Sequence, residues 1–197
     1  MKKLQVIAGN CVLENLKTSL ETSSFLKEMS EKFNFDLIYK SSYKKDNRSS
    51  TEYFSTLGNE KCTEIFSELK NKNFKIITDV HNLYELDLDL FNFIDIIQIP
   101  AYLCMQTELT TKVAQKGKSI NLKKGQFLSP NDVEKIVLKI KSAGNNNITI
   151  TERGTCFGYR DLMVDPRSFL ILKKLNYPVF FDVGHSVRKN GFPSSNI

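Results

Sequence analysis

The chain has 197 residues, of which 41% are hydrophobic, and this is enough for one domain with a buried core. A formal charge of +6 could indicate nucleic-acid binding, but the lysines are spread along amphipathic segments and no helix-turn-helix or RNA-binding pattern occurs, so we expect no nucleic-acid partner. The four cysteines show no CxxC spacing, and the N-terminal apolar run is too short for a signal peptide or a membrane span. These features indicate a cytoplasmic protein with no membrane partner.

Seven short apolar runs rich in β-branched residues each predict a strand. They are Leu4–Ala8, Phe35–Tyr39, Lys75–Thr78, Asp95–Ile99, Ser119–Lys123, Ile148–Thr151 and Val179–Asp182. The segments between them have helical spacing, which is clearest over residues 133–140, where Asn131 is expected to cap the helix and Gly144 to end it. Alternating strands and helices imply a parallel sheet.

Two folds suit this alternation, an open doubly wound sheet or a (β/α)8 TIM barrel. Polar side chains follow every strand, and this favours the barrel, because only in a barrel do all the strand ends converge on one mouth. These residues are Asn10 and Cys11, Lys40 to Ser42, Asp79 and His81, Gln98, Lys123 and Lys124, Glu152 and Arg153, and Asp182 and His185. We therefore expect a (β/α)8 barrel that lacks its last helix, strand and helix, with one incomplete domain at residues 1–187 and a divergent tail at 188–197.

The expected mouth of the barrel is cationic. Its positive residues are Lys40, Lys45, Arg48, Lys123 and Arg153. Few acids oppose them, chiefly Asp79, Glu152 and Asp182. Any one lysine is ordinarily a solvated surface charge, but five cations at strand ends indicate a small-molecule substrate with phosphate and carboxylate groups.

The stretch Ile148–Arg167 concentrates these features. A strand leads into Glu152 and Arg153, a glycine-bracketed loop follows at residues 154–159, and Pro166 prepares the next helix. From this stretch alone, an anion site and a surface turn with an ion pair are both open.

Cys11 and His185 follow the first and the seventh predicted strand. A thiolate and an imidazole could share a divalent metal such as zinc, iron or manganese, although two ligands make a poor site. Spacing alone favours the ordinary interpretations, a small buried cysteine and a hydrogen-bonded loop histidine.

Seven motifs resemble the 3-deoxy-D-manno-octulosonate 8-phosphate synthase family, in that family's order and spacing. They are IAGNC (7–11), KSSYKKDNRSS (40–50), ITDVHN (77–82), DIIQIPAYLCMQTEL (95–109), NLKKGQFLSP (121–130), ERGTCFGY with VDPRS (152–168), and FFDVGHSV (180–187). The resemblance implies a (β/α)8 barrel, typically in a tetramer. It also implies condensation of phosphoenolpyruvate with D-arabinose 5-phosphate, with release of phosphate, for lipopolysaccharide biosynthesis.

The resemblance also assigns roles to residues of this chain. Lys40, Lys45, Lys123 and Arg153 are implied as phosphoenolpyruvate anchors, with Gln98 and Ala101 beside them. Asn47, Arg48, Ser49 and Ser50 are implied as the clamp for arabinose 5-phosphate. The catalytic residues would be Asp79, Lys45 and Asn47. Metal-dependent members have cysteine at position 11, so Cys11 and His185 resemble two of four metal ligands.

The sequence departs from the family pattern at several positions. Asn10 replaces a proline, Asp46 a small residue, Asn82 a glutamate, Met105 an arginine that helps to bind phosphate, and Gly184 a threonine. After position 187 the resemblance stops, and with it the glutamate and the aspartate that complete the family's metal site. We expect a truncated or decayed product, a partial sequence, or completion by a partner subunit. The alternative function is that of an impaired remnant that at most binds phosphorylated metabolites.

Overall fold

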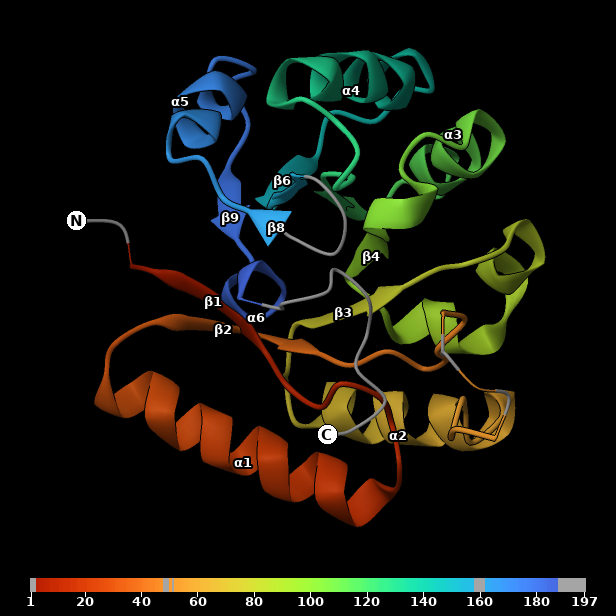
Figure 1. Cartoon of the computed structure of the whole chain (residues 1–197). Coiled ribbons are helices and arrows are strands. Elements are labelled where there is room, and N and C mark those ends of the chain that lie inside the picture. Colours follow the sequence, from red (N-terminus) through yellow and green to blue (C-terminus); the bar gives the residue numbers. More distant parts are fainter. Residues whose placement is uncertain (1–2, 48–49, 51, 158–161, 188–197) are drawn as a thin grey trace. The chain divides into compact units, whose positions relative to one another are not determined.

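The computed structural model describes residues 3–47, 50, 52–157 and 162–187. The chain divides into two compact units. Unit 1 comprises Met1–Asp79 and Asp87–Ile96, and unit 2 comprises Val80–Leu86 and Ile97–Ile197. Figure 1 shows the helices and strands of both units, coloured along the sequence. The predicted tail at 188–197 lies outside the described residues, and the single domain at 1–187 stays a prediction.

All seven predicted strands are present, and each boundary lies within one residue of its prediction. They are β1 (Gln5–Ala8), β2 (Asp36–Lys40), β3 (Ile76–Asp79), β4 (Ile96–Ile99), β5 (Ser119–Lys123), β6 (Ile148–Glu152) and β9 (Val179–Phe181). The sheet order is β1-β2-β3-β4-β5-β6-β9, which is also their order along the chain. Pairing is parallel between β1 and β2, β2 and β3, β5 and β6, and β6 and β9. Parallel strands in chain order with helices between them are what a (β/α)8 barrel requires of its first seven strands, so the predicted fold class is confirmed.

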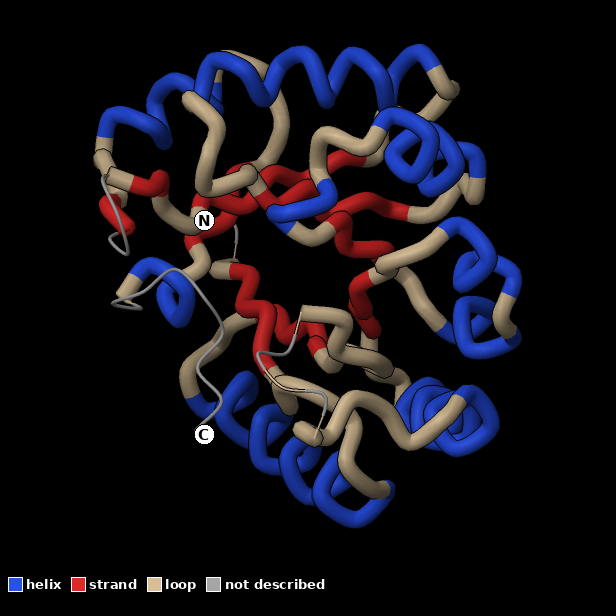
Figure 2. The backbone as a smooth tube through the Cα atoms, turned by 45° about the vertical axis from the view of Figure 1, so that its right-hand side comes forward, coloured by secondary structure: helices blue, strands red, loops and turns tan. Residues whose placement is uncertain are grey.

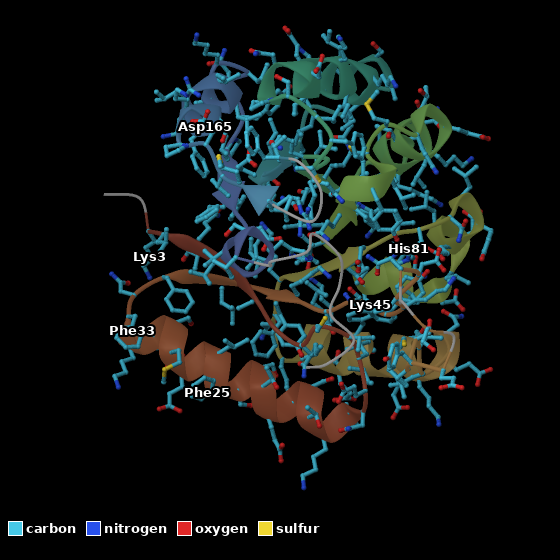
Figure 3. All side chains as sticks on the ribbon, in the orientation of Figure 1. Lys3, Phe25, Phe33, Lys45, His81 and Asp165 are labelled. Carbon is cyan, nitrogen blue, oxygen red and sulfur yellow. The ribbon has the colours of Figure 1, made fainter. Side chains whose placement is uncertain are left out.

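In unit 1, α1 (Leu16–Lys32) and α2 (Asn59–Asn71) follow β1 and β2. The side chain of Asn15 caps α1 by accepting a hydrogen bond from Thr18 N at 2.7 Å. Phe25 on α1 and Phe33, the residue directly after the helix, are both exposed (Figure 3). A short 3-10 helix, η2 (Asp89–Phe93), packs against α2. This packing buries Phe66, Leu69 and Leu90 completely.

In unit 2, each described parallel strand is again followed by a helix (Figure 2). The helices are α3 (Thr107–Gln115), α4 (Val133–Ser142), α5 (Arg167–Lys173) and α6 (Val183–Ser186). Three further 3-10 helices are η1 (Leu83–Asp87), whose last residue belongs to unit 1, η3 (Ala101–Leu103) and η4 (Pro130–Asp132). Within the described residues, no helix is long and apolar enough to cross a membrane.

One predicted helix cap is wrong. Asn131 lies inside η4 and donates its backbone N–H to the Ser129 hydroxyl at 3.3 Å, so Ser129 caps this end of the α4 region. Proline suits the first helical position, because its missing N–H would have no partner there, and this makes the preceding serine the cap. Gly144 does follow the helix end as expected, with φ +93°, a conformation that glycine adopts without strain.

The glycine loop after Arg153 contains more structure than predicted. β7 (Thr155–Cys156) pairs antiparallel with β8 (Leu162–Met163), so the segment begins as a short hairpin. Gly154 has φ +96° at the turn from β6 into β7, where a residue with a Cβ would be strained. Helix α5 then begins directly after Pro166, as expected.

Candidate functional site

The end of β2 in unit 1 brings two lysines to one serine. Lys40 Nζ donates to Ser42 Oγ at 2.9 Å, and Lys45 Nζ donates to the same oxygen at 2.7 Å. Ser42 is fully buried, and its backbone is fixed by a bridge to Val12 and a hydrogen bond from Leu13 N. Two ammonium groups on one neutral hydroxyl form a strongly positive spot. Figure 3 labels Lys45 on this loop.

Asp79, the last residue of β3, offsets part of this charge. Its Oδ1 lies 3.1 Å from Lys40 Nζ, and only 18% of the Lys40 side chain and 10% of the Asp79 side chain are exposed. The structure therefore brings three predicted site residues together, with two positive charges against one negative charge. Such an arrangement favours an anionic ligand.

Cys11 lies just beyond a close approach of β1 to β2. A Cβ on Gly9 would lie 2.1 Å from the Lys40 carbonyl oxygen, so only glycine fits there. The next residue, Asn10, accepts a hydrogen bond from Tyr39 and donates to Thr22 Oγ1 at 3.4 Å. Asparagine in place of the family's proline thus has partners in this chain. Cys11 itself is an exposed free thiol.

The predicted sugar-phosphate clamp is only partly described. Asn47 is exposed, Ser50 Oγ accepts from Glu52 N at 3.2 Å, and Arg48 and Ser49 lie outside the described residues. Asp46, which adds a negative charge to the predicted clamp, forms an ion pair with Lys44 at 3.0 Å. Lys44 therefore offsets part of the charge of Asp46 within the loop.

In unit 2, the ends of β5 and β9 meet through Lys123 and Asp182. The Lys123 ammonium donates to Asp182 Oδ2, and His185 Nδ1 lies 2.8 Å from the same oxygen. Asp182 Oδ1 also accepts the backbone N–H of His185 at 3.0 Å and so caps α6. His185 Nδ1 is farther from Lys123 Nζ, at 3.4 Å, so the neutral ring donates Nδ1–H to the carboxylate and keeps its lone pair on Nε2.

The charges of this group shift its pKa values. Burial would raise the pKa of Asp182, but the hydrogen bond from His185 and the charge of Lys123 outweigh burial and hold it well below the usual range. The hydrogen bond to Asp182 would raise the pKa of His185, but burial and the charges of Lys123 and Arg153 together lower it. The imidazole is therefore neutral at pH 7.

Arg153 follows β6 and is nearly buried, with Nη1 donating to Gln126 Oε1 at 3.2 Å. Its positive charge contributes to lowering the pKa of His185. Gln98 at the end of β4 and Ala101 in η3 are also buried in unit 2, and the Gln98 carbonyl accepts Val80 N at 3.2 Å. The predicted binding roles of these residues stay predictions.

The metal assignment is not supported by a complete donor set. Among the described residues, no group of three or more His, Cys, Asp or Glu side chains is arranged to hold a metal ion. Cys11 belongs to unit 1 and His185 to unit 2. The lone pair on His185 Nε2, with Nδ1–H on a carboxylate, suits a metal-ligating histidine, but the described donors alone do not fit a metal site.

Three departures from the family pattern have different consequences. Asn82 donates through its backbone and side chain to Glu85, at 3.2 and 3.3 Å, and so helps to hold the loop after β3. Met105 is 44% exposed, and its side chain supplies no charge where the family has an arginine. Gly184 lies in the first turn of α6.

Two strand-end residues that were given no binding or catalytic role, Ser42 and Lys124, prove central to the geometry of the site. Ser42 links Lys40 to Lys45, and its position between two lysines directly after a strand was the available signal. Lys124 is fully buried beneath the loop that carries Arg153, and only the alternation of side chains along β5 could have separated it from Lys123.

The fold and the residues at the strand ends define a parallel α/β protein with cationic groups after β2, β5 and β6. Residues 2–196 match the family described as "DAHP synthetase I family", and the chain belongs to that family. Its curated relatives include the 2-dehydro-3-deoxyphosphooctonate aldolases of Fusobacterium nucleatum and Brucella canis, both 42% identical. These matches cover 96% and 95% of this chain and 68% of each relative.

A third relative of the same name, from Protochlamydia amoebophila, is 43% identical over 95% of this chain and 68% of its own length. That name is a synonym of the synthase family indicated by the seven motifs, so the resemblance is confirmed. The comparisons leave the metal-dependent subclass as a prediction.

Proposed function

We propose that this protein is a transferase that condenses phosphoenolpyruvate with D-arabinose 5-phosphate to give 3-deoxy-D-manno-octulosonate 8-phosphate and phosphate. The observation that carries the proposal is the convergence of Lys40 and Lys45 on Ser42 Oγ at 2.9 and 2.7 Å, with Asp79 alongside. Relatives at 42% identity that carry the name of this activity support it.

The reaction makes a carbon–carbon bond at C3 of phosphoenolpyruvate and a carbon–oxygen bond from water to C2, and it breaks the carbon–oxygen bond between C2 and the phosphate. C3 of the enol attacks the sugar aldehyde, water adds at C2, and phosphate leaves with the bridging oxygen. The substrates bring two phosphates and a carboxylate, so the protein must hold several negative charges during a step that redistributes charge. We assign Lys40 and Lys45 of unit 1, and Lys123 and Arg153 of unit 2, to that task.

Asp79 and Asp182 have supporting roles in this proposal. Each carboxylate lies against a lysine of the proposed anchor set and therefore fixes the position of its ammonium group. A charge held in place before the reaction stabilises developing charge without reorganisation. Gln98, Ala101, Asn47, Arg48, Ser49 and Ser50 complete the proposed substrate contacts, as the family motifs imply.

We also propose a divalent metal, zinc, iron or manganese, with Cys11 and His185 among its ligands. The further donors would come from outside the described residues or from another chain. The proposal rests on the exposed thiol of Cys11 and on the tautomer of His185, and no step of the reaction is derived through the metal. We propose a homo-oligomer in the cytoplasm as the working form.

The test is release of phosphate from phosphoenolpyruvate. Purified protein is stripped of metal with a chelator and assayed with and without arabinose 5-phosphate, and with zinc, iron or manganese restored in turn. We expect phosphate to be released from phosphoenolpyruvate only when arabinose 5-phosphate is present. A folded sample that releases no phosphate with any of these metals contradicts the proposed function.

A further inference from the structure

The side chains at the ends of β5 and β6 point alternately to two faces. Lys123 donates to Asp182, and the Arg153 side chain donates to Gln126 Oε1. Lys124 and Glu152, each one residue away along its strand, face one another instead, with Lys124 Nζ 3.4 Å from Glu152 Oε1. Successive residues of a strand alternate in this way, so a second pair of charges lies behind the cations of the predicted site.

This second pair is among the most buried in the described chain, with 0% of the Lys124 side chain and 1% of the Glu152 side chain exposed. Burial lowers the pKa of Lys124, although Glu152 opposes the change. Charges buried this deeply destabilise the fold unless neighbouring groups form hydrogen bonds with them. The hydrogen-bond partners of Lys124 and Glu152 therefore show which segments the pair holds in place.

Besides its ion pair with Glu152, the Lys124 ammonium donates hydrogen bonds to the loops beside Arg153. The ammonium donates to Thr155 Oγ1 at 2.9 Å and to the Gly154 carbonyl at 3.1 Å, beyond Arg153 in the chain. It also donates to the carbonyls of Gly125 and Leu128, both at 3.4 Å, which flank Gln126 in the chain. Gln126 is the residue whose side chain accepts from Arg153 Nη1.

Glu152 completes the support from the other side. Its Oε1 accepts the backbone N–H groups of Arg153 at 2.9 Å and Gly154 at 2.7 Å. The backbone of Arg153 is therefore fixed by the Glu152 carboxylate, whose charge Lys124 neutralises. The side chain of Arg153 is bound by Gln126, which lies in a loop that Lys124 also holds. The conformation around Arg153 depends on both charges.

We propose that Lys124 is a positioning residue that, together with Glu152, holds Arg153 in place for binding the phosphoenolpyruvate anion. This rests on the proposed function, in which Arg153 is an anion anchor. Lys124 itself acts from behind the site through Glu152, Gly154 and Thr155.

The test measures the dissociation constant for phosphoenolpyruvate by calorimetry in Lys124→Met, Arg153→Met and the double variant. Lys135→Met is the control, because Lys135 is exposed in α4 and pairs only locally with Asp132. We expect Lys124→Met to weaken binding about tenfold, in the range of one lost charge-assisted contact, and Lys135→Met to change nothing. Adding Lys124→Met to Arg153→Met should have no further effect, because residues that act through one another are not additive.

Two further variants separate positioning from general damage to the fold. Lys124→Arg keeps the charge and the donors, and should recover most of the affinity. Lys124→Met combined with Glu152→Gln removes both charges of the pair, so neither is left buried without its partner. If Lys124→Met alone fails to fold, the affinity for phosphoenolpyruvate is measured in this combined variant instead. The proposal is overturned if the folded variant with Lys124→Met and Glu152→Gln binds phosphoenolpyruvate as tightly as the wild type. It is also overturned if Lys124→Met weakens binding equally in the wild type and in Arg153→Met.

Hydrogen exchange in the ligand-free protein distinguishes a failure of this proposal from a failure of the proposed function. The amides of Arg153 and Gly154 should exchange at least several-fold faster in Lys124→Met than in Lys135→Met, because their acceptor is no longer held. If the wild type does not bind phosphoenolpyruvate, the proposed function fails, and faster exchange still supports positioning of Arg153. Unchanged exchange overturns the positioning role whatever the ligand result.

Discussion

Lys40 Nζ lies 3.1 Å from Asp79 Oδ1, and this ion pair joins the last residue of β2 to the last residue of β3. The pair is largely buried, while Lys40 also donates to Ser42 beside Lys45. The carboxylate therefore both orients Lys40 and reduces its repulsion with Lys45.

Replacing Asp79 with asparagine tests this dual role. Asp79→Asn keeps the shape and an acceptor oxygen but removes the charge, so we expect the free energy of unfolding to fall by about 1–3 kcal/mol. Urea denaturation followed by circular dichroism measures it. Asp36→Asn, at an exposed position at the start of β2, is the control and should change stability little. Equal stabilities of the two variants would show that the ion pair contributes nothing.

Gly9→Ala tests the close approach of β1 to β2. The added Cβ would meet the Lys40 carbonyl oxygen at 2.1 Å, so the two backbones must separate. We expect a loss of about 1–3 kcal/mol or more, as for other overpacked sites, measured by urea denaturation. Gly184→Ala is the control, since its Cβ would have only an ordinary contact at 3.7 Å. A fully stable Gly9→Ala variant would contradict this account of the approach.

Tyr39 makes stability depend on alkaline pH. Burial raises its pKa to about 12, and the hydrogen bonds with Ser19 and Asn10 only partly offset burial. Because the folded pKa exceeds the unfolded value of about 10, the contribution is complete below about pH 10 and is lost as the pH rises towards the folded value.

We therefore expect the stability difference between the wild type and Tyr39→Phe to shrink by about 2 kcal/mol between about pH 10 and 12. Urea denaturation of both proteins at a series of pH values measures the difference. The titration of other groups cancels, because both proteins contain them. Tyr84→Phe, at a position 66% exposed, is the control and should show no such trend. A constant difference across this range would rule out a raised pKa for Tyr39.

The strands and the strand-end residues were predictable because their signals are local. Runs such as Ile148–Glu152 carry β-branched and apolar residues that define a strand without reference to the rest of the chain. The cap at Ser129 and the hairpin of β7 and β8 were missed because both depend on local geometry that several residue types allow.

The pairings within the site were not predictable from the sequence alone. Lys123 and Asp182 are 59 residues apart, and the fold alone determines that they meet. Lys123 and Lys124 are identical and adjacent in sequence, yet one lies beside Asp182 and the other beneath the Arg153 loop. Only the direction of each side chain, which alternates from one residue to the next along an extended chain, separates their roles.

The proposed metal role of Cys11 is tested by Cys11→Asn. Loss of a thiolate ligand should lower the affinity for a soft or borderline metal, and we expect at least a tenfold drop. Metal content after equilibration with zinc, measured by elemental mass spectrometry, gives the result. Cys156→Ser is the matched control, since Cys156 is also an exposed free thiol. If Cys11→Asn retains the wild-type metal content, Cys11 is not a ligand.

The central claim is that the chain's cations hold two anionic substrates while a carbon–carbon bond forms between them. The most direct measurement is mass spectrometry of the products after incubation with phosphoenolpyruvate, arabinose 5-phosphate and divalent metal. The account predicts a phosphorylated eight-carbon keto acid, with its mass equal to both substrates plus water less phosphoric acid, and none from Arg153→Met on the same timescale. Wild-type protein that is folded and binds phosphoenolpyruvate, but yields no such product, would contradict it.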